Sequence, residues 1–113
     1  MSTSFVFRWE SDYILERESE YQSKLKEKLL DRFPGAYIFK TDPSQKRGAP
    51  DLIILYSDTW AALEVKRNSR AKHRPLQDRR IEELNRMGFA AIIFPENESE
   101  VLNEMERAFN AGW

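Results

Sequence analysis

The stretch RGAPDLIILYSDTWAALEVK, residues 47–66, decides the fold because it holds two apolar runs separated by a short turn. Residues 51–56 suit a buried central strand, and residues 60–66 suit the strand that follows it. The link between them is short, so the two strands are expected to form an antiparallel hairpin. In such a hairpin the first residue of one strand lies near the last residues of the other.

Three charged side chains are expected to converge at that end of the hairpin. Asp51 begins the first strand, and Glu64 and Lys66 share one face near the end of the second. Two close carboxylates repel each other unless a cation lies between them, and Mg²⁺ takes one or two carboxylates plus water and phosphate oxygens. Such an ion activates water, while Lys66 can orient that water or neutralise the transition state. A Glu-x-Lys pair alone is usually a solvated surface pair; the combination with Asp51 favours phosphodiester hydrolysis.

The rest of the chain predicts the elements around the hairpin. Expected elements are a helix over 12–33, a strand over 36–40, a helix from Pro75 to about Met87, a strand over 89–94 and a helix over 97–113. The order αβββαβα predicts an α/β fold with helices flanking a mixed four-stranded sheet. Residues 1–9 are read as a loose arm or an edge strand, and Asn97 as the N-cap of the last helix. Residues 1–113 are expected to form a single domain, with its core over about 12–95.

The amino-acid composition limits the kinds of metal site and cross-link that the protein can form. The 113 residues contain no cysteine and one histidine, and the net charge is −1. A disulfide framework or a zinc–thiolate site is therefore excluded, and a metal site would use oxygen ligands, which favours Mg²⁺ or Mn²⁺. No apolar run is long enough to span a bilayer and the N-terminus lacks a signal-peptide pattern, so a cytoplasmic protein without membrane partner or organic cofactor is expected.

Positive charge concentrates in residues 66–80. A basic segment suits contact with a phosphate backbone, although charge alone is equally compatible with a solvated loop and helix face. DNA contacts are expected from Lys46, Arg47, Arg67, Arg70, Lys72, His73, Arg74 and Arg79. The chain has no second histidine with which His73 could bind a metal. His73 is therefore expected either to contact DNA or to have no functional role. Trp60 is read as a core or flanking residue.

Several segments also resemble a known family. GAPDLIIL and WAALEVK resemble the PD-(D/E)XK nuclease signature, and RPLQDRRIEELNRMGF and ESEYQSKLKEKL resemble the VRR-NUC branch, in which a P-x-Q element opens the helix after the catalytic strand. The resemblance spans about residues 18–95. It implies a restriction-endonuclease-like core and Mg²⁺- or Mn²⁺-dependent DNA cleavage. It also implies a small, phage-type homodimer, with some such proteins acting on branched DNA such as Holliday junctions.

The resemblance also implies roles for individual residues. The catalytic residues it implies are Glu20, Asp51, Glu64, Lys66 and Gln77. The metal ligands it implies are Asp51, Glu64 and the backbone carbonyl of Val65, with Glu20 joining through a water. Glu18 is the alternative to Glu20 as the site glutamate on the first helix.

Two other functions stay open at this point. A non-catalytic nucleic-acid-binding module would bind DNA with steep salt dependence but cleave it with no metal. A subunit specialised for protein interaction would bind DNA with no dependence on Arg70, Arg74 and Arg79. The complete set of acids and lysine favours the endonuclease. A homodimer has a physical motive, since cutting two strands symmetrically needs two sites related by a two-fold axis.

Overall fold

The computed structural model describes residues 3–42 and 48–111, with side chains from residue 18 onwards within these ranges. Its elements are α1 (Thr3–Arg32), β1 (Tyr37–Lys40), β2 (Leu52–Tyr56), β3 (Thr59–Val65), α2 (Pro75–Met87), β4 (Phe89–Ile93), the short 3-10 helix η1 (Pro95–Asn97) and α3 (Glu98–Ala111). The predicted order αβββαβα is confirmed. Among the described helices, none combines the length and apolar content needed to cross a membrane.

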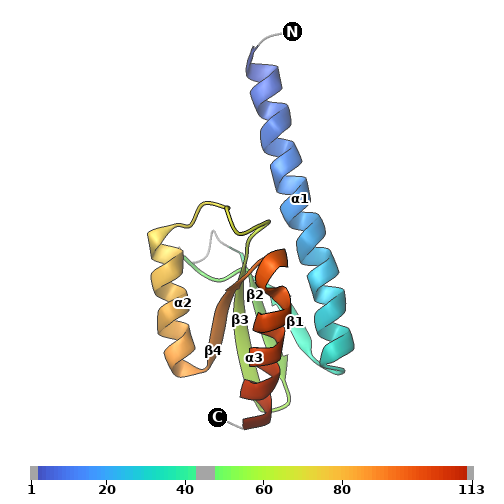
Figure 1. Cartoon of the computed structure of the whole chain (residues 1–113), viewed down its shortest axis with the longest axis vertical. Helices are drawn as coiled ribbons and strands as arrows, with labels where there is room; N and C mark the ends of the chain where they lie inside the picture. Colours follow the sequence, from blue (N-terminus) through green and yellow to red (C-terminus); the bar gives the residue numbers. More distant parts are fainter. Residues whose placement is uncertain (1–2, 43–47, 112–113) are drawn as a thin grey trace.

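The four strands form one mixed sheet in the order β1-β2-β3-β4. β1 with β2 and β2 with β3 pair antiparallel, whereas β3 and β4 pair parallel. The predicted hairpin is confirmed, with Leu52 opposite Leu63 and Tyr56 opposite Thr59. Its turn uses the positive φ of 56° at Ser57. Parallel strands need a long crossover, and α2 provides it between β3 and β4 (Figure 1).

Helices cover both faces of the sheet. On one face, buried side chains of α1 and α3 pack against β2, β3 and β4, and this main core contains Leu25, Leu29, Leu52, Ile54, Leu63, Ile93 and Met105. On the other face, α2 packs Ile81 against Ala62 of β3 and Ala90 of β4. Alternation along β3 therefore directs Leu63 toward α1 and α3, and Ala62 and Glu64 toward the α2 face.

Polar contacts fasten α1 to α3, which lie side by side (Figure 1). The Tyr21 hydroxyl donates to Glu98 Oε1 at 3.0 Å, and Lys28 Nζ donates to Glu98 Oε2 at 2.7 Å. Arg32 donates to side chains of α3 one and two turns further along. Between these contacts, Leu25 and Leu29 are fully buried. The orientation of α1 over the sheet is thus fixed by its second half.

The start of α1 differs from the expectation. Residues 1–9 were expected to form a loose arm or an edge strand, whereas the helix begins at Thr3; residues 1 and 2 lie outside the described part. No glycine or proline interrupts residues 3–32, and helix formation is cooperative once it has been nucleated. The helix expected over 12–33 therefore continues toward the N-terminus.

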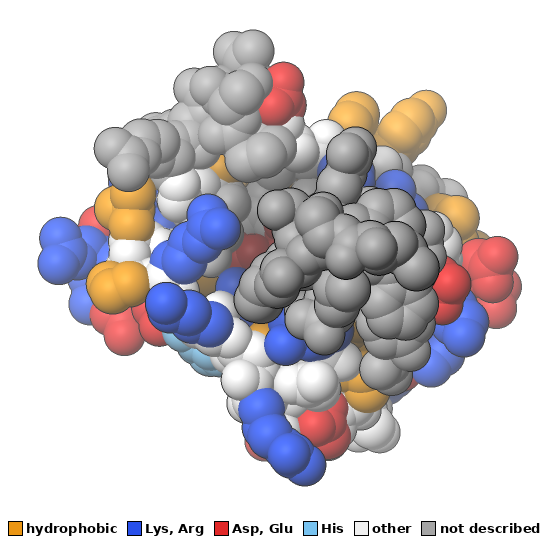
Figure 2. Space-filling view, turned by 90° about the horizontal axis from the view of Figure 1, so that it is seen from above, with side chains coloured by type: hydrophobic (Ala, Val, Ile, Leu, Met, Phe, Trp, Pro, Cys, Tyr) orange, Lys and Arg blue, Asp and Glu red, His pale blue; other side chains and the backbone are white. Residues whose placement is uncertain are grey.

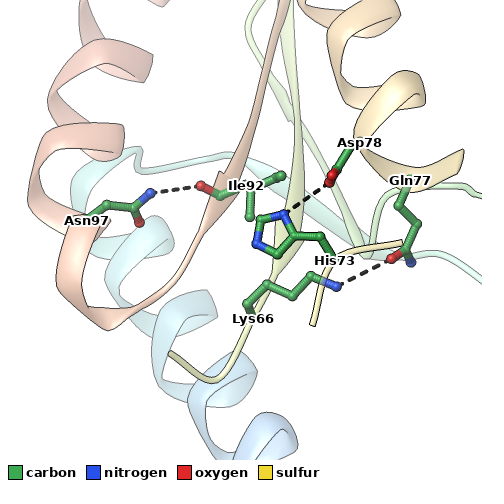
Figure 3. A network of polar contacts seen from close by, with 6 residues as sticks. All are labelled: Lys66, His73, Gln77, Asp78, Ile92 and Asn97. Atoms are coloured by element: carbon green, nitrogen blue, oxygen red, sulfur yellow. Dashed lines mark hydrogen bonds and ion pairs between the residues drawn. The ribbon is translucent and has the colours of Figure 1, made fainter. Parts of the chain in front are cut away.

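Asn97 lies in the connection between β4 and α3. Its Oδ1 accepts a hydrogen bond from the Phe94 N–H at 2.9 Å, and its Nδ2 donates to the Ile92 carbonyl at 3.0 Å (Figure 3). Asn97 directly precedes α3, which begins at Glu98, so its predicted position before the helix is confirmed. Both of these side-chain hydrogen bonds, however, go to the end of β4 and not to the first turn of α3.

Gly88→Ala is expected to destabilise the fold by about 1–3 kcal/mol, the usual cost of overpacking. A Cβ at Gly88 would lie 2.5 Å and 2.7 Å from two atoms of the Trp60 ring, which packs against the cluster under α2. Urea unfolding measures the change. The double variant Gly88→Ala/Trp60→Leu has a smaller side chain in place of the ring. Its loss in free energy of unfolding should be smaller than the sum of the losses in the two single variants. A Gly88→Ala protein as stable as the wild type would contradict the packing described.

Candidate active site

A pocket of about 590 Å³ lies at the end of the sheet where β3 finishes. Its walls come from α1, the start of β2, the end of β3, the following loop and the first turn of α2. The lining residues are Glu18, Gln22, Asp51, Glu64, Val65, Lys66, Arg67, Ala71, Lys72, Arg74 and Gln77. The structure thus brings these five parts of the chain together, including the three charged residues expected to meet at the hairpin end.

Asp51 and Glu64 lie next to each other because the hairpin register places them there. Leu52 is opposite Leu63, so the preceding residue Asp51 falls beside Glu64. The backbone N–H of Val65 donates to Asp51 Oδ2 at 2.7 Å, which fixes that carboxylate. Glu64 is only 2% exposed, and its Oε2 has no hydrogen-bond partner among the described atoms. An unpartnered buried carboxylate oxygen costs free energy, so it points to a missing partner.

The pKa of Glu64 is raised to about 9, first by burial and then by its hydrogen bond with Asp51 and the negative charge there. The ammonium of Lys66 acts in the opposite direction, and the charge of Glu18 adds to the increase. One lysine therefore does not balance the negative charge gathered at this point. A cation bound between the carboxylates would favour the ionised form of Glu64.

Lys66 is held on two sides. Its backbone N–H donates to the Ile93 carbonyl at 2.9 Å, which extends the pairing of β3 with β4 by one residue. Its Nζ donates to Gln77 Oε1 at 3.3 Å (Figure 3). Lys66 is 8% exposed, and Gln77 lies in the first turn of α2, which Pro75 opens as expected. The helix therefore positions the lysine head group beside the acids.

The loop 67–74 supplies the positive rim of the pocket, through Arg67, Lys72 and Arg74. Figure 2 shows Lys and Arg side chains gathered at this end of the molecule, beside a recess with an acidic side chain at its floor. The Ser69 N–H donates to Glu96 Oε2 at 3.0 Å, and this bond is the main reason why the pKa of Glu96 is lowered. Because Glu96 follows β4, the loop is anchored from a distant part of the chain.

The other predicted DNA contacts lie elsewhere. Arg70 and Arg79 are exposed and do not line the pocket. His73 Nδ1 lies 3.2 Å from Asp78 Oδ1, so this side chain pairs across the first turn of α2 (Figure 3). Lys46 and Arg47 lie outside the described residues. Trp60 packs against the cluster under α2, which confirms the core reading.

The two candidate acids on α1, Glu18 and Glu20, lie at different places. Glu18 lines the pocket, together with Gln22 one turn further along, whereas exposed Glu20 lines a separate cavity of about 170 Å³. Glu20, the residue that the resemblance implies, therefore lies outside this pocket, and its competitor Glu18 lies in the lining. The angular positions of the two glutamates around the helix distinguish them. At about 100° per residue, Glu18 is nearly in line with Leu25, whereas Glu20 falls about 140° away. Gln22 was likewise not singled out by the sequence.

The carboxylates of the pocket can be compared with the ligands that a divalent metal ion requires. No group of three acidic or histidine side chains capable of holding a metal ion occurs where side chains are described. Asp51 and Glu64 nevertheless offer two adjacent carboxylates, and one oxygen of Glu64 is buried without a partner in the described part of the chain. Mg²⁺ typically takes one or two carboxylates and keeps several waters. The residues present therefore fit such an ion.

The structure is an α/β fold in which a mixed sheet lies between helices and an acid pair and a lysine lie at the end of the central hairpin. The structure is similar to a solved structure described as a VRR_NUC domain, with a TM-score of 0.62 and 22% sequence identity, over 77% of this chain and 95% of that chain. The expected VRR-NUC-like fold with a restriction-endonuclease-like core is thereby confirmed. No family model and no curated protein matches the sequence.

Proposed function

We propose that the chain is a metal-dependent DNA endonuclease that hydrolyses phosphodiester bonds, with a preference for branched DNA such as Holliday junctions. The observation that carries the proposal is the pair of half-buried Asp51 and buried Glu64, next to a lysine fixed by Gln77. The Oε2 atom of Glu64 lacks a partner among the described residues. Cations on the neighbouring loop suit a phosphate backbone. The VRR-NUC-like fold adds support.

Each residue has a role that follows from its place. Asp51, Glu64 and the backbone carbonyl of Val65 would hold Mg²⁺ or Mn²⁺, and Glu18 would contribute from the helix. When bound, such an ion supplies an activated water and stabilises charge on the phosphate. Lys66 reaches the same space from β3, where its ammonium can neutralise charge on the phosphate, and Gln77 keeps its head group there.

DNA contacts extend beyond the acids. Arg67, Lys72 and Arg74 line the pocket and would neutralise phosphates on either side of the cut. Contacts to the DNA backbone are also proposed for Lys46, Arg47, Arg70, His73 and Arg79. Each phosphate contact releases counterions, so binding should weaken steeply as salt increases. A homodimer would present two such pockets, one for each strand of a symmetric branch.

The experiment is a cleavage panel of supercoiled, linear, flapped and four-way-junction DNA, with Mg²⁺ or Mn²⁺ and with chelator as control. Metal-dependent cutting that is fastest on branched DNA is the expected result. Cutting of all forms at the same rate would contradict the proposed preference for branched DNA but would still support endonuclease activity. Salt-dependent DNA binding without cleavage by either metal would instead make the chain a binding module.

A matched pair of helix variants tests the acid on α1. Glu18→Gln is expected to lower the cleavage rate by about 10-fold or more, because it removes a carboxylate that lines the pocket. Glu20→Gln, two residues away and facing another cavity, is expected to leave the rate unchanged. Single-turnover rates at saturating Mg²⁺ compare the two. A slower rate for Glu20→Gln than for Glu18→Gln would instead assign the role of the α1 acid to Glu20.

A further inference from the structure

Three large side chains on β1 and β2 remain exposed although they lie in the sheet. Tyr37 is 69% exposed, Phe39 is 50% exposed and Leu55 is 43% exposed. Tyr37 is opposite Leu55, and Phe39, two residues along the strand, is opposite Ile53, so all three point to one face. We call these three residues the aromatic shelf.

The aromatic shelf lies on the same face of the sheet as the acid pair. Phe39 is opposite Ile53, which is opposite Ala62, and Ala62 and Glu64 share a face of β3. α2 packs on this face over Ala62 of β3 and Ala90 of β4, whereas β1 and β2 carry the exposed side chains. Two residues of strand span about 7 Å, so the row of Phe39 is adjacent to the row of Asp51 and Glu64.

The geometry of the shelf suits flat ligands. The Tyr37 and Phe39 rings are nearly parallel, with centroids 6.2 Å apart and an interplanar angle of 13°. Exposed aromatic rings on a sheet are surfaces on which nucleic-acid bases stack, and stacking tolerates any base sequence. A base can stack only when it is unpaired. Positive charge near the shelf comes from Arg67, Lys72 and Arg74 of the pocket lining. Exposed Lys40 follows Phe39 but shares the opposite face of the sheet with Leu52.

We propose that the aromatic shelf stacks unpaired nucleotides adjacent to the cut, so that the chain selects DNA with a single-stranded segment beside the scissile phosphate. This inference rests on the proposed endonuclease function and specifies its substrate. The shelf and the acids are continuous, because they lie on one face of the sheet in adjacent rows of residues. Basic side chains also line the pocket that contains the acids.

A second copy of the chain fits the shelf less well. Aromatic side chains present roughly 150–250 Å² each, so three partly exposed side chains offer on the order of 300–400 Å². A stable protein interface needs about 800 Å² from each partner. β1 is also short, and a charged Lys40 at its end disfavours pairing with another strand edge. The shelf is therefore assigned to nucleic acid.

Binding measurements without turnover test the inference, and they use Asp51→Asn as the background so that the DNA stays intact. The probes are a fluorescent single strand, a flapped duplex and a fully paired duplex of equal length. Tyr37→Ala/Phe39→Ala is expected to weaken binding of the single strand and the flap by about 5- to 150-fold, the loss of one stacked base, with unchanged duplex binding. Met87→Ala, with a side chain 72% exposed at the end of α2, is the control and should bind like the background.

Photocrosslinking locates the contact. A 5-iododeoxyuridine in the unpaired segment should crosslink to Tyr37 or Phe39, identified by mass spectrometry. Unchanged binding of flap and single strand in the double variant would overturn the inference, and so would an equal loss on the paired duplex. A change from dimer to monomer in light scattering of the double variant would also overturn it, because the shelf would then be an interface. Absence of cleavage by the wild-type chain refutes the proposed function instead, since binding is measured separately.

Discussion

Asp51→Asn is expected to lower metal-dependent DNA cleavage by about 10²- to 10³-fold or more while the protein stays folded. Asparagine keeps an oxygen that can accept the Val65 N–H, so the end of the hairpin retains its 2.7 Å hydrogen bond. The substitution removes the charge that, together with Glu64, would hold the ion. Single-turnover cleavage of a supercoiled plasmid in Mg²⁺ measures the effect, and circular dichroism verifies the fold.

Asp58→Asn is the matched control for this variant. Asp58 is exposed in the turn at the opposite end of the same hairpin, far from the pocket. The same chemical change should leave both cleavage and stability as they are in the wild type. If Asp51→Asn cleaved as fast as Asp58→Asn, the acid pair would not be the site of the chemistry.

Glu64→Gln is expected to abolish cleavage and, without metal, to stabilise the protein at alkaline pH. Glu64 is buried, with a pKa raised to about 9. Below about pH 4.5 the side chain holds its proton in both the folded and the unfolded chain, so pH has no effect through this group. Between about pH 4.5 and 9 the unfolded chain releases the proton and the folded chain keeps it, so stability falls as pH rises.

The size of this effect is bounded by the linkage relation. A single group with such a shift contributes at most about 1.4 kcal/mol per pH unit within the window. Urea unfolding of the metal-free wild type from pH 5 to 8 should show this decline, and Glu64→Gln should lose most of it because glutamine does not titrate. Glu104→Gln, an exposed change on α3, is the control and should keep the wild-type slope.

Metal addition supplies an independent measurement. An ion that binds the folded chain alone stabilises it by mass action, so Mg²⁺ or Mn²⁺ should raise the unfolding temperature of the wild type at pH 8. The same addition should leave Glu64→Gln nearly unchanged, since one of its two carboxylates is gone. An equal increase in both proteins would place the metal elsewhere.

Much of the fold follows from local patterns in the sequence. The short turn after residues 51–56 leaves only a hairpin, and once the register is set, Asp51 must fall beside Glu64. Pro75 and Gly88 bound α2, and an intervening helix allows β3 and β4 to run parallel. These features depend on neighbours in the chain, which is why spacing alone predicts them.

Features that depend on distant segments were not predictable in the same way. Glu96 anchors the basic loop through Ser69, 27 residues earlier, and no periodicity signals that contact. Glu18 is a different case, because helical phase with Leu25 would have favoured it over Glu20. The helical start at Thr3 overrode a weak strand-like alternation.

The pocket draws its key groups from segments far apart: Glu18 from α1, Asp51 before β2, Glu64 from β3 and Gln77 from α2. A contiguous peptide contains them all only if it spans residues 18–77, about half of the chain. On the proposed function, a nascent chain therefore cannot assemble the site before the start of α2 has left the ribosome.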